Sequence, residues 1–217
     1  MELSQYVDLN KQQFVSEIDT FTEKRYAQFY KYFGKEDRRV LDIGCNTGRG
    51  GMILRQLEPA LRVTGLDIIE DRIRRIPEGL YERLILSPAD SIDVPDNFFD
   101  AVVAGEVIEH IHPNDADAVL KEINRTLRPG GKILLTTPNP RAILVLMGRD
   151  DVLKDPSHIG LMMPAQLKEK LIRCGFEKVR FKGSGKMTKY LPDNFPLFSV
   201  FGSYLAIATK PASGNGK

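Results

Sequence analysis

A run of aspartate, glycine and asparagine near residue 40 offers groups that could bind a ligand. It reads Asp42-x-Gly44-x-Asn46-x-Gly48, directly after a short apolar stretch, and Asp67 follows at the end of the next apolar stretch. Glycines between a strand and a helix let a ligand approach the backbone closely. A carboxylate about 20 residues beyond the first glycine can accept hydrogen bonds from both hydroxyls of a ribose. The joint pattern therefore predicts a nucleoside-binding turn.

Two common nucleotide-binding motifs do not fit this turn. The dinucleotide fingerprint G-x-G-x-x-G needs glycine at positions 44, 46 and 49, and the sequence has Asn46 and Arg49 instead. The phosphate-binding pattern G-x-x-x-x-G-K-[ST] does not occur in the sequence. An NAD-dependent oxidoreductase is therefore disfavoured and stays as an alternative.

Three histidines are candidates for proton transfer, because imidazole titrates near neutral pH. His110 follows the fourth apolar stretch, His112 stands two residues later, and His158 lies in a long segment before Pro164. We rank His158 first, His110 second and His112 last as a catalytic base. His110, His112 and Asp115 could also hold a divalent ion. A polar loop leading to a helix explains this cluster better, because Asp115 suits a helix N-terminus, and no metal is predicted.

Apolar stretches alternate with helical patterns, and this alternation predicts a doubly wound α/β fold with a mostly parallel sheet and helices on both faces. Strands are expected at 39–43, 62–67, 84–86, 100–105, 132–137, 176–181 and 204–209. Helical patterns occupy 11–33, 47–57, 70–76, the segment between Asn114 and Pro129, and 164–175, with Asn114 as an N-cap.

The last two expected strands have no helical pattern between them. The final strand is therefore placed antiparallel at the edge of the sheet, as in many mixed doubly wound sheets. Two connections, 138–163 and 183–203, exceed the usual loop length and carry Leu, Met, Phe and Tyr. Both leave the carboxyl ends of strands, where open α/β sheets bind ligands, so we interpret them as covers over a substrate.

Composition excludes several classes of protein. The 217 residues carry 31 Lys and Arg against 29 Asp and Glu, a formal net charge of +2, which does not favour a dedicated nucleic-acid binder. The two cysteines have no disulfide or metal-ligand pattern, and the first residues lack the apolar core of a signal peptide. No apolar run reaches the ~20 residues of a membrane helix. A cytoplasmic protein, monomeric or homodimeric, is expected.

Four stretches resemble the class I S-adenosylmethionine-dependent methyltransferases, in the order of that family. They are VLDIGCNTGRGG, TGLDIIEDRI, FFDAVVAGEVIEHI and LRPGGKILLTTPNP. EVIEHI and the later SHIGLMMPAQLKEKLIRCGFEKV look like the subgroup that methylates quinone precursors, glycans and sugars. The resemblance implies a seven-stranded, Rossmann-like sheet with a reversed last strand. It departs from the family at Asn46, which tolerates a positive φ and can preserve the turn.

The resemblance also implies roles for individual residues. The turn would pack against the methionine and ribose parts of the cofactor, Asp67 would hold the ribose hydroxyls, and Glu106 would line the methionine end. Asp90 and Ser91 would meet the adenine edge, although Asp90 also suits an ordinary turn. The complete set of expected cofactor-binding residues is Asp42, Gly44, Asn46, Gly48, Asp67, Ile68, Asp90, Ser91 and Glu106.

These observations divide the chain into an N-terminal helical segment, 1–36, a methyltransferase domain, 37–210, and a flexible tail, 211–217. The expected activity is transfer of a methyl group from S-adenosylmethionine, leaving S-adenosylhomocysteine, to a hydroxyl of a sugar, glycan precursor or quinone-like metabolite. A cofactor-binding module without catalysis remains a second alternative, because fold alone does not establish activity.

Overall fold

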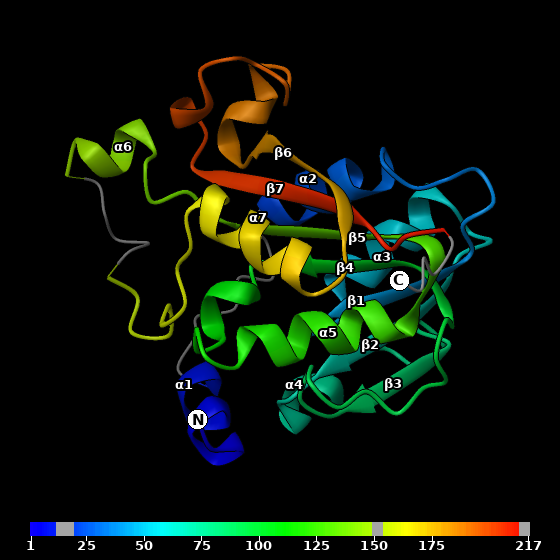
Figure 1. Cartoon of the computed structure of the whole chain (residues 1–217). Coiled ribbons are helices and arrows are strands. Elements are labelled where there is room, and N and C mark those ends of the chain that lie inside the picture. The colour runs from blue at the N-terminus through cyan, green and yellow to red at the C-terminus, as the bar shows by residue number, and fades with distance from the viewer. Residues whose placement is uncertain (12–19, 149–153, 213–217) are drawn as a thin grey trace.

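The computed structural model describes residues 1–11, 20–148 and 154–212, and Figure 1 shows this part of the chain built around one twisted sheet. The described sheet has seven strands in the order β3-β2-β1-β4-β5-β7-β6. Their bounds are β1 (Arg39–Ile43), β2 (Arg62–Asp67), β3 (Arg83–Leu86), β4 (Phe99–Gly105), β5 (Leu127–Pro138), β6 (Glu177–Ser184) and β7 (Ser203–Thr209). Strands β1 to β5 pair in parallel, and β7 pairs antiparallel with β5 and β6. The predicted doubly wound fold with a reversed last strand is confirmed.

The expected position of the last strand was wrong. β7 lies between β5 and β6, and β6 occupies the edge of the sheet. The burial of the two strands explains this order. Residues 204–208 of β7 are all buried, whereas the first half of β6 alternates between half-buried and exposed residues. A strand that is apolar throughout is stabilised in the interior of a sheet, where both of its faces are covered.

Helices cover both faces of the sheet, as Figure 1 shows. On one face, α5 (Ala116–Thr126) and α7 (Pro164–Arg173) contribute Leu120 and Leu167 to a large apolar cluster. On the other, α2 (Thr20–Tyr30) and α3 (Arg49–Leu57) contribute Phe29 and Leu54 to a second cluster. The shorter elements are α1 (Leu3–Lys11), α4 (Glu70–Ile73), α6 (Ile143–Leu146), η1 (Ile108–His110), η2 (Lys186–Lys189) and η3 (Phe198–Val200).

Two helix starts differ from the sequence prediction. α3 begins at Arg49 rather than at residue 47, because Gly48 precedes it in a left-handed conformation with φ 92°. α5 has Asp115, not Asn114, at its N-cap position, and Asp115 makes no side-chain capping bond there. Its carboxylate instead accepts a hydrogen bond from the Tyr6 hydroxyl at 2.5 Å, so a contact with α1 replaces the expected cap.

The N-terminal part of the chain, expected as a helical segment over 1–36, contains α1 and α2. The predicted helix over 11–33 falls partly on residues 12–19, and the predicted tail partly on residues 213–217, both outside the described residues. Among the described helices, none has both the length and the apolar content needed to cross a bilayer.

Candidate functional site

A cavity of about 290 Å³ opens at the carboxyl ends of the central parallel strands. This is the edge where doubly wound sheets bind ligands. Its lining comes from the loops after β1, β2, β3 and β4, from the first turn of chain after η1, and from α1. The predicted cofactor-binding residues among its lining are Gly44, Asn46, Asp67, Ile68, Asp90 and Glu106.

The turn after β1 has the strained backbone that its residue types predict. Gly44, Asn46 and Gly48 have φ of 70°, 52° and 92°, a region that glycine adopts freely and asparagine more readily than most residues. The amide of Gly44 donates to the Leu66 carbonyl at 2.8 Å, which ties the turn to β2. A Cβ on Gly44 would lie 2.6 Å from Cγ2 of Val107, so the turn also needs a residue without a side chain there.

Asp67 links the turn to the end of β2. Its Oδ2 accepts a hydrogen bond from the amide of Asn46, and its Oδ1 accepts one from the amide of Ile69, both at 2.9 Å. Burial raises the pKa of Asp67, and these two amides oppose that rise. Each carboxylate oxygen can accept a further bond, so the side chain both shapes the turn and faces the cavity with acceptor capacity.

Asp42 supports the turn from behind and is not among the residues lining the cavity. Its two oxygens accept hydrogen bonds from the hydroxyls of Tyr26, at 2.6 Å, and Tyr81, at 2.7 Å. Burial raises the pKa of Asp42 to about 7, because the two tyrosine bonds only partly offset desolvation. The Tyr81 hydroxyl also accepts a bond from the amide of Gly51. Asp42 therefore holds α2, α3 and the turn together.

Gly48 and Ser91 also lie outside the cavity lining. A Cβ on Gly48 would meet a methyl group of Leu80 at 2.9 Å, so Gly48 packs against the segment before β3. The carbonyl of Ser91 accepts a bond from the Ser87 hydroxyl. This bond closes the turn after β3, and Asp90 of that turn does reach the cavity.

Glu106 lines the cavity and directly follows β4. It has φ 56°, an uncommon conformation for a residue with a long side chain, which tertiary contacts must maintain. Its Oε2 accepts a long hydrogen bond of 3.4 Å from the Ser203 hydroxyl, and Oε1 lies 3.7 Å from the guanidinium of Arg25.

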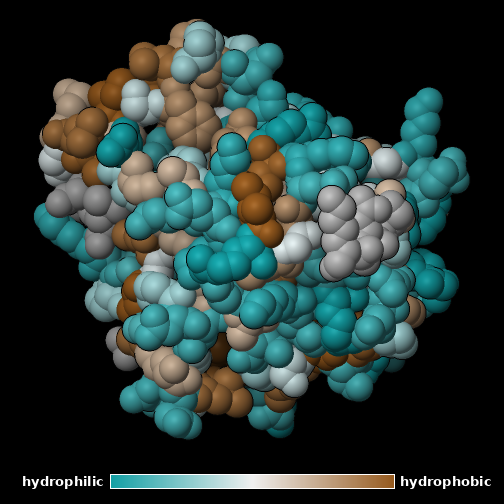
Figure 2. Space-filling model, viewed as in Figure 1, coloured by the Kyte–Doolittle hydropathy of each residue, from teal (hydrophilic) through white to brown (hydrophobic). Residues whose placement is uncertain are grey.

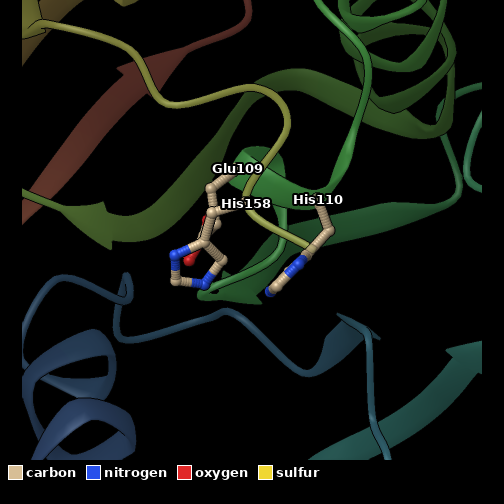
Figure 3. A group of neighbouring side chains, drawn as sticks. All are labelled: Glu109, His110 and His158. Carbon is tan, nitrogen blue, oxygen red and sulfur yellow. The ribbon is translucent and has the colours of Figure 1, made fainter. Parts of the chain in front are cut away.

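The predicted catalytic histidines, His110 and His158, lie together next to Glu109, as Figure 3 shows. The imidazole rings of the two histidines are 4.8 Å apart between centroids. Nδ1 of His110 is 3.0 Å from the carbonyl oxygen of Ser157. Burial and the charge of His158 lower the pKa of His110 to about 4, so its ring is neutral at pH 7. Of the two, His110 also lines the cavity.

The group of His110, His112 and Asp115 that the sequence suggested is not assembled as one cluster. His112 and Asp115 instead bind Tyr6 of α1, whose hydroxyl accepts from the His112 amide at 2.9 Å. Sequence analysis did not single out Glu109 as part of this cluster. The available signal was the spacing of Glu106, Glu109 and His110 in one short segment.

α1 forms a wall of the cavity, a role that sequence reasoning missed. Leu3, Tyr6 and Asn10 line it, and the Asn10 carbonyl accepts a bond from the Arg72 guanidinium. None of the residues of α1 is buried, so the helix shows no strong apolar face that would reveal its docking site. The docking site of α1 is identified only by its contacts in the folded chain, which Tyr6 and Asn10 make.

Comparison with known proteins gives one consistent family. A family model described as a methyltransferase domain matches residues 18–180. A probable S-adenosylmethionine-dependent methyltransferase of Mycolicibacterium smegmatis is 36% identical over 142 residues, 64% of this chain and 52% of that protein. The fatty-acid O-methyltransferase of the same species is 33% identical over 128 residues, 58% of this chain and 46% of that protein.

Solved structures agree with these relatives. The crystal structure of a SAM dependent methyltransferase from Archaeoglobus fulgidus superposes with a TM-score of 0.69 and 26% identity, over 87% of this chain and 92% of that one. The chain spans about half the length of the curated relatives it matches. The domain match covers well over half of the chain, and it includes the glycine turn, Asp67 and the Glu109 segment. The chain belongs to the class I S-adenosylmethionine-dependent methyltransferases.

Proposed function

We propose that the chain transfers a methyl group from S-adenosylmethionine to an oxygen of a small molecule. The observation that carries the proposal is one cavity lined by two chemically different groups of residues. We place the nucleoside beside Asp67, which follows β2, and the acceptor end beside His110, which follows β4 together with Glu106. This arrangement suits a reaction in which the methyl group of the cofactor must be positioned next to the reacting oxygen of the acceptor.

Orphaned polar atoms support the fit of the cofactor. Within residues 1–11, 20–148 and 154–212, Oδ1 of Asn46 and Oε1 of Glu106 are buried without a hydrogen-bond partner, and the only charge paired with Oε1 there is the Arg25 guanidinium at 3.7 Å. Buried acceptors without partners cost about 1–3 kcal/mol each, and both of these residues line the cavity. The ammonium group and the ribose hydroxyls of S-adenosylmethionine are donors that would satisfy such acceptors.

The cofactor roles follow from these positions. Asp67 accepts from the ribose hydroxyls, Ile68 packs against adenine, and Asp90 faces its edge. Asn46 and Glu106 bind the methionine part. Asp42 and Gly48 act indirectly, by holding the glycine turn, and Ser91 shapes the turn that presents Asp90.

The acceptor end must position an oxygen and remove its proton. When bound, S-adenosylmethionine supplies a methyl group made electrophilic by a positively charged sulfur. We assign His158 and His110, with Glu109, to the acceptor oxygen, because they are the titratable groups grouped beside Glu106. Positioning of this kind contributes several kcal/mol, and up to about 7–11 in favourable systems.

We favour an acceptor with an apolar body. Leu146 and Met147, in the long segment after β5, are 72% and 73% exposed, and Leu197 in the other long segment is 52% exposed. Figure 2 shows apolar surface at its upper left, where Figure 1 places α6 and the η2–η3 segment. A hydroxyl or carboxyl on a quinone-like, lipid-like or glycosylated molecule fits this surface. The relative named a fatty-acid O-methyltransferase is consistent with the same class.

Binding and turnover test the proposal separately. Isothermal titration with S-adenosylhomocysteine should show one site per chain, and NAD should show none. Incubation with S-adenosylmethionine and a panel of phenols, fatty acids and sugars, followed by mass spectrometry, should show a gain of one methyl group on an acceptor of the first two kinds. Cofactor binding without turnover on the panel would favour a module without catalysis, and no cofactor binding would refute the proposal.

A further inference from the structure

Glu109, His110 and His158 form a compact group of potential metal ligands at the acceptor end of the cavity. One ligand atom from each residue lies within 4.8 Å of the others. Figure 3 shows the three side chains pointing toward one another from two segments of chain, the η1 turn and the loop before α7. The group therefore depends on the fold, because 47 residues separate His110 from Ser157, the neighbour of His158.

Main-chain contacts on both sides of His158 hold the two segments together. The Ser157 carbonyl meets Nδ1 of His110 at 3.0 Å, and the Gly160 amide donates to the Glu109 carbonyl at 2.7 Å. A Cβ on Gly160 would lie 2.0 Å from the carbonyl oxygen of Ile111. The approach is so close that only glycine is accommodated at position 160.

The carboxylate of Glu109 is buried and needs an interaction partner. The Glu109 side chain is fully buried, and in the described part of the chain neither carboxylate oxygen has a hydrogen-bond partner. A buried carboxylate without a hydrogen bond or a counter-ion is strongly unfavourable. Coordination of a cation would remove that cost.

We propose that Glu109, His110 and His158 bind a divalent transition-metal ion such as Zn²⁺. Two imidazoles and one carboxylate are a donor set that zinc accepts at about 2.0–2.2 Å. A tetrahedral ion at that distance needs ligand atoms about 3.4 Å apart. The present separations of up to 4.8 Å close to that value with side-chain shifts of about 1 Å, within ordinary rotamer adjustment.

The hydrogen bond of His110 supports the assignment. When Nδ1–H of a neutral imidazole donates to a backbone carbonyl, the lone pair of Nε2 becomes the ligand atom, and metal-binding histidines are commonly oriented in this way. The Ser157 carbonyl provides this contact.

The place of the group gives the ion a use in the reaction, and this step rests on the proposed function. Three protein ligands leave a coordination position open, as in catalytic zinc sites. That position would face the cavity beside His110 and Glu106, which both line it. A hydroxyl of the acceptor bound there would lose its proton to solvent more easily, because a metal ion lowers the pKa of a bound oxygen. The two histidines would then act as ligands rather than as a base.

The binding test needs neither cofactor nor acceptor, so its failure is distinguishable from failure of the proposed function. Metal-free, untagged protein is titrated with Zn²⁺ by calorimetry, and its melting temperature is measured with and without the ion. The substitutions Glu109→Gln and His158→Ala each remove one ligand, and His112→Ala removes the histidine that lies outside the group. Melting curves of all variants without metal show whether each one is folded.

We expect one Zn²⁺ per chain, a rise in melting temperature, and affinity reduced at least about tenfold in Glu109→Gln and His158→Ala. His112→Ala should bind as the unchanged protein does. Absence of saturable one-to-one binding would overturn the proposal. Equal losses in all three folded variants, or no loss in either ligand variant, would place the ion elsewhere and also overturn it.

Discussion

The ribose contact assigned to Asp67 can be tested quantitatively. The change is Asp67→Ala, and the ligand is S-adenosylhomocysteine. Each oxygen of Asp67 already accepts one backbone amide at 2.9 Å, and each keeps capacity for one ribose hydroxyl. Two hydrogen bonds to a charged group contribute about 1.5–3 kcal/mol each. Their sum of about 3–6 kcal/mol corresponds to a loss of affinity of roughly 100-fold to 10,000-fold.

The same substitution also removes the two bonds that shape the turn, so the loss in affinity alone does not prove ribose contact. A double-mutant cycle separates the two effects. Calorimetry is repeated with the 2′-deoxy and 3′-deoxy forms of S-adenosylhomocysteine. The unchanged protein should lose affinity for each deoxy ligand, whereas Asp67→Ala should bind all three ligands about equally.

Ser91→Ala is the matched control, because the structure places Ser91 outside the cavity lining and its contribution to the turn after β3 comes from its main chain. Its affinity should stay within about twofold, since surface substitutions away from specific contacts have small effects. If the deoxy ligands lose as much affinity in Asp67→Ala as in the unchanged protein, Asp67 does not bind the ribose and the assignment is refuted.

Three further predictions concern the surroundings of the site. Burial raises the pKa of Asp42 from 3.8 to about 7, so the native state binds a proton that the unfolded state has lost, and the protein loses stability as pH rises through that window. Asp42→Asn cannot ionise, so between pH 5 and 7 its free energy of unfolding should gain about 2 kcal/mol relative to that of the unchanged protein, measured by urea unfolding. No change in that difference would contradict the assigned pKa. Gly160→Ala should lower the free energy of unfolding by about 1–3 kcal/mol through its clash with Ile111, and retention of full stability would show that the two segments are not in close contact. Tyr6→Phe removes the bonds to Asp115 and the His112 amide and should speed release of S-adenosylhomocysteine several-fold in stopped-flow measurements, while an unchanged rate would show that α1 does not retain the ligand.

The parts of the site that sequence predicted are local in the chain. The glycine turn and Asp67 belong to one strand–turn–helix–strand unit, whose hydrogen bonds connect Gly44 to Leu66 and Asn46 to Asp67. Residue types alone indicate the positive φ angles of such a turn. The approximate bounds of most strands were predictable for the same reason, because apolar runs report burial directly.

The parts that sequence did not predict depend on contacts between distant segments. The place of β7 between β5 and β6 depends on which strands pair. The alternation of apolar residues along a strand indicates which face is buried, and it does not indicate which strand lies next to it. α1 docks through Tyr6 onto Asp115, 109 residues away. Sequence analysis grouped His110 with His112 and Asp115, because the three are close in the sequence, and it did not consider Glu109. In the structure the chain after η1 carries His112 and Asp115 to Tyr6 instead.

The close approach at Gly160 has a consequence for how acceptor choice can change. The cavity-lining residues assigned to the cofactor lie between Gly44 and Glu106, whereas the loop bearing His158 is attached to the η1 segment through Gly160 and Ser157. The chain before Ser157 can therefore change in sequence or length, while the contacts of Ser157 with His110 and of Gly160 with Glu109 hold the His158 side chain in place. Changes in that segment would then alter which acceptor is bound and leave the affinity for the methyl donor unchanged.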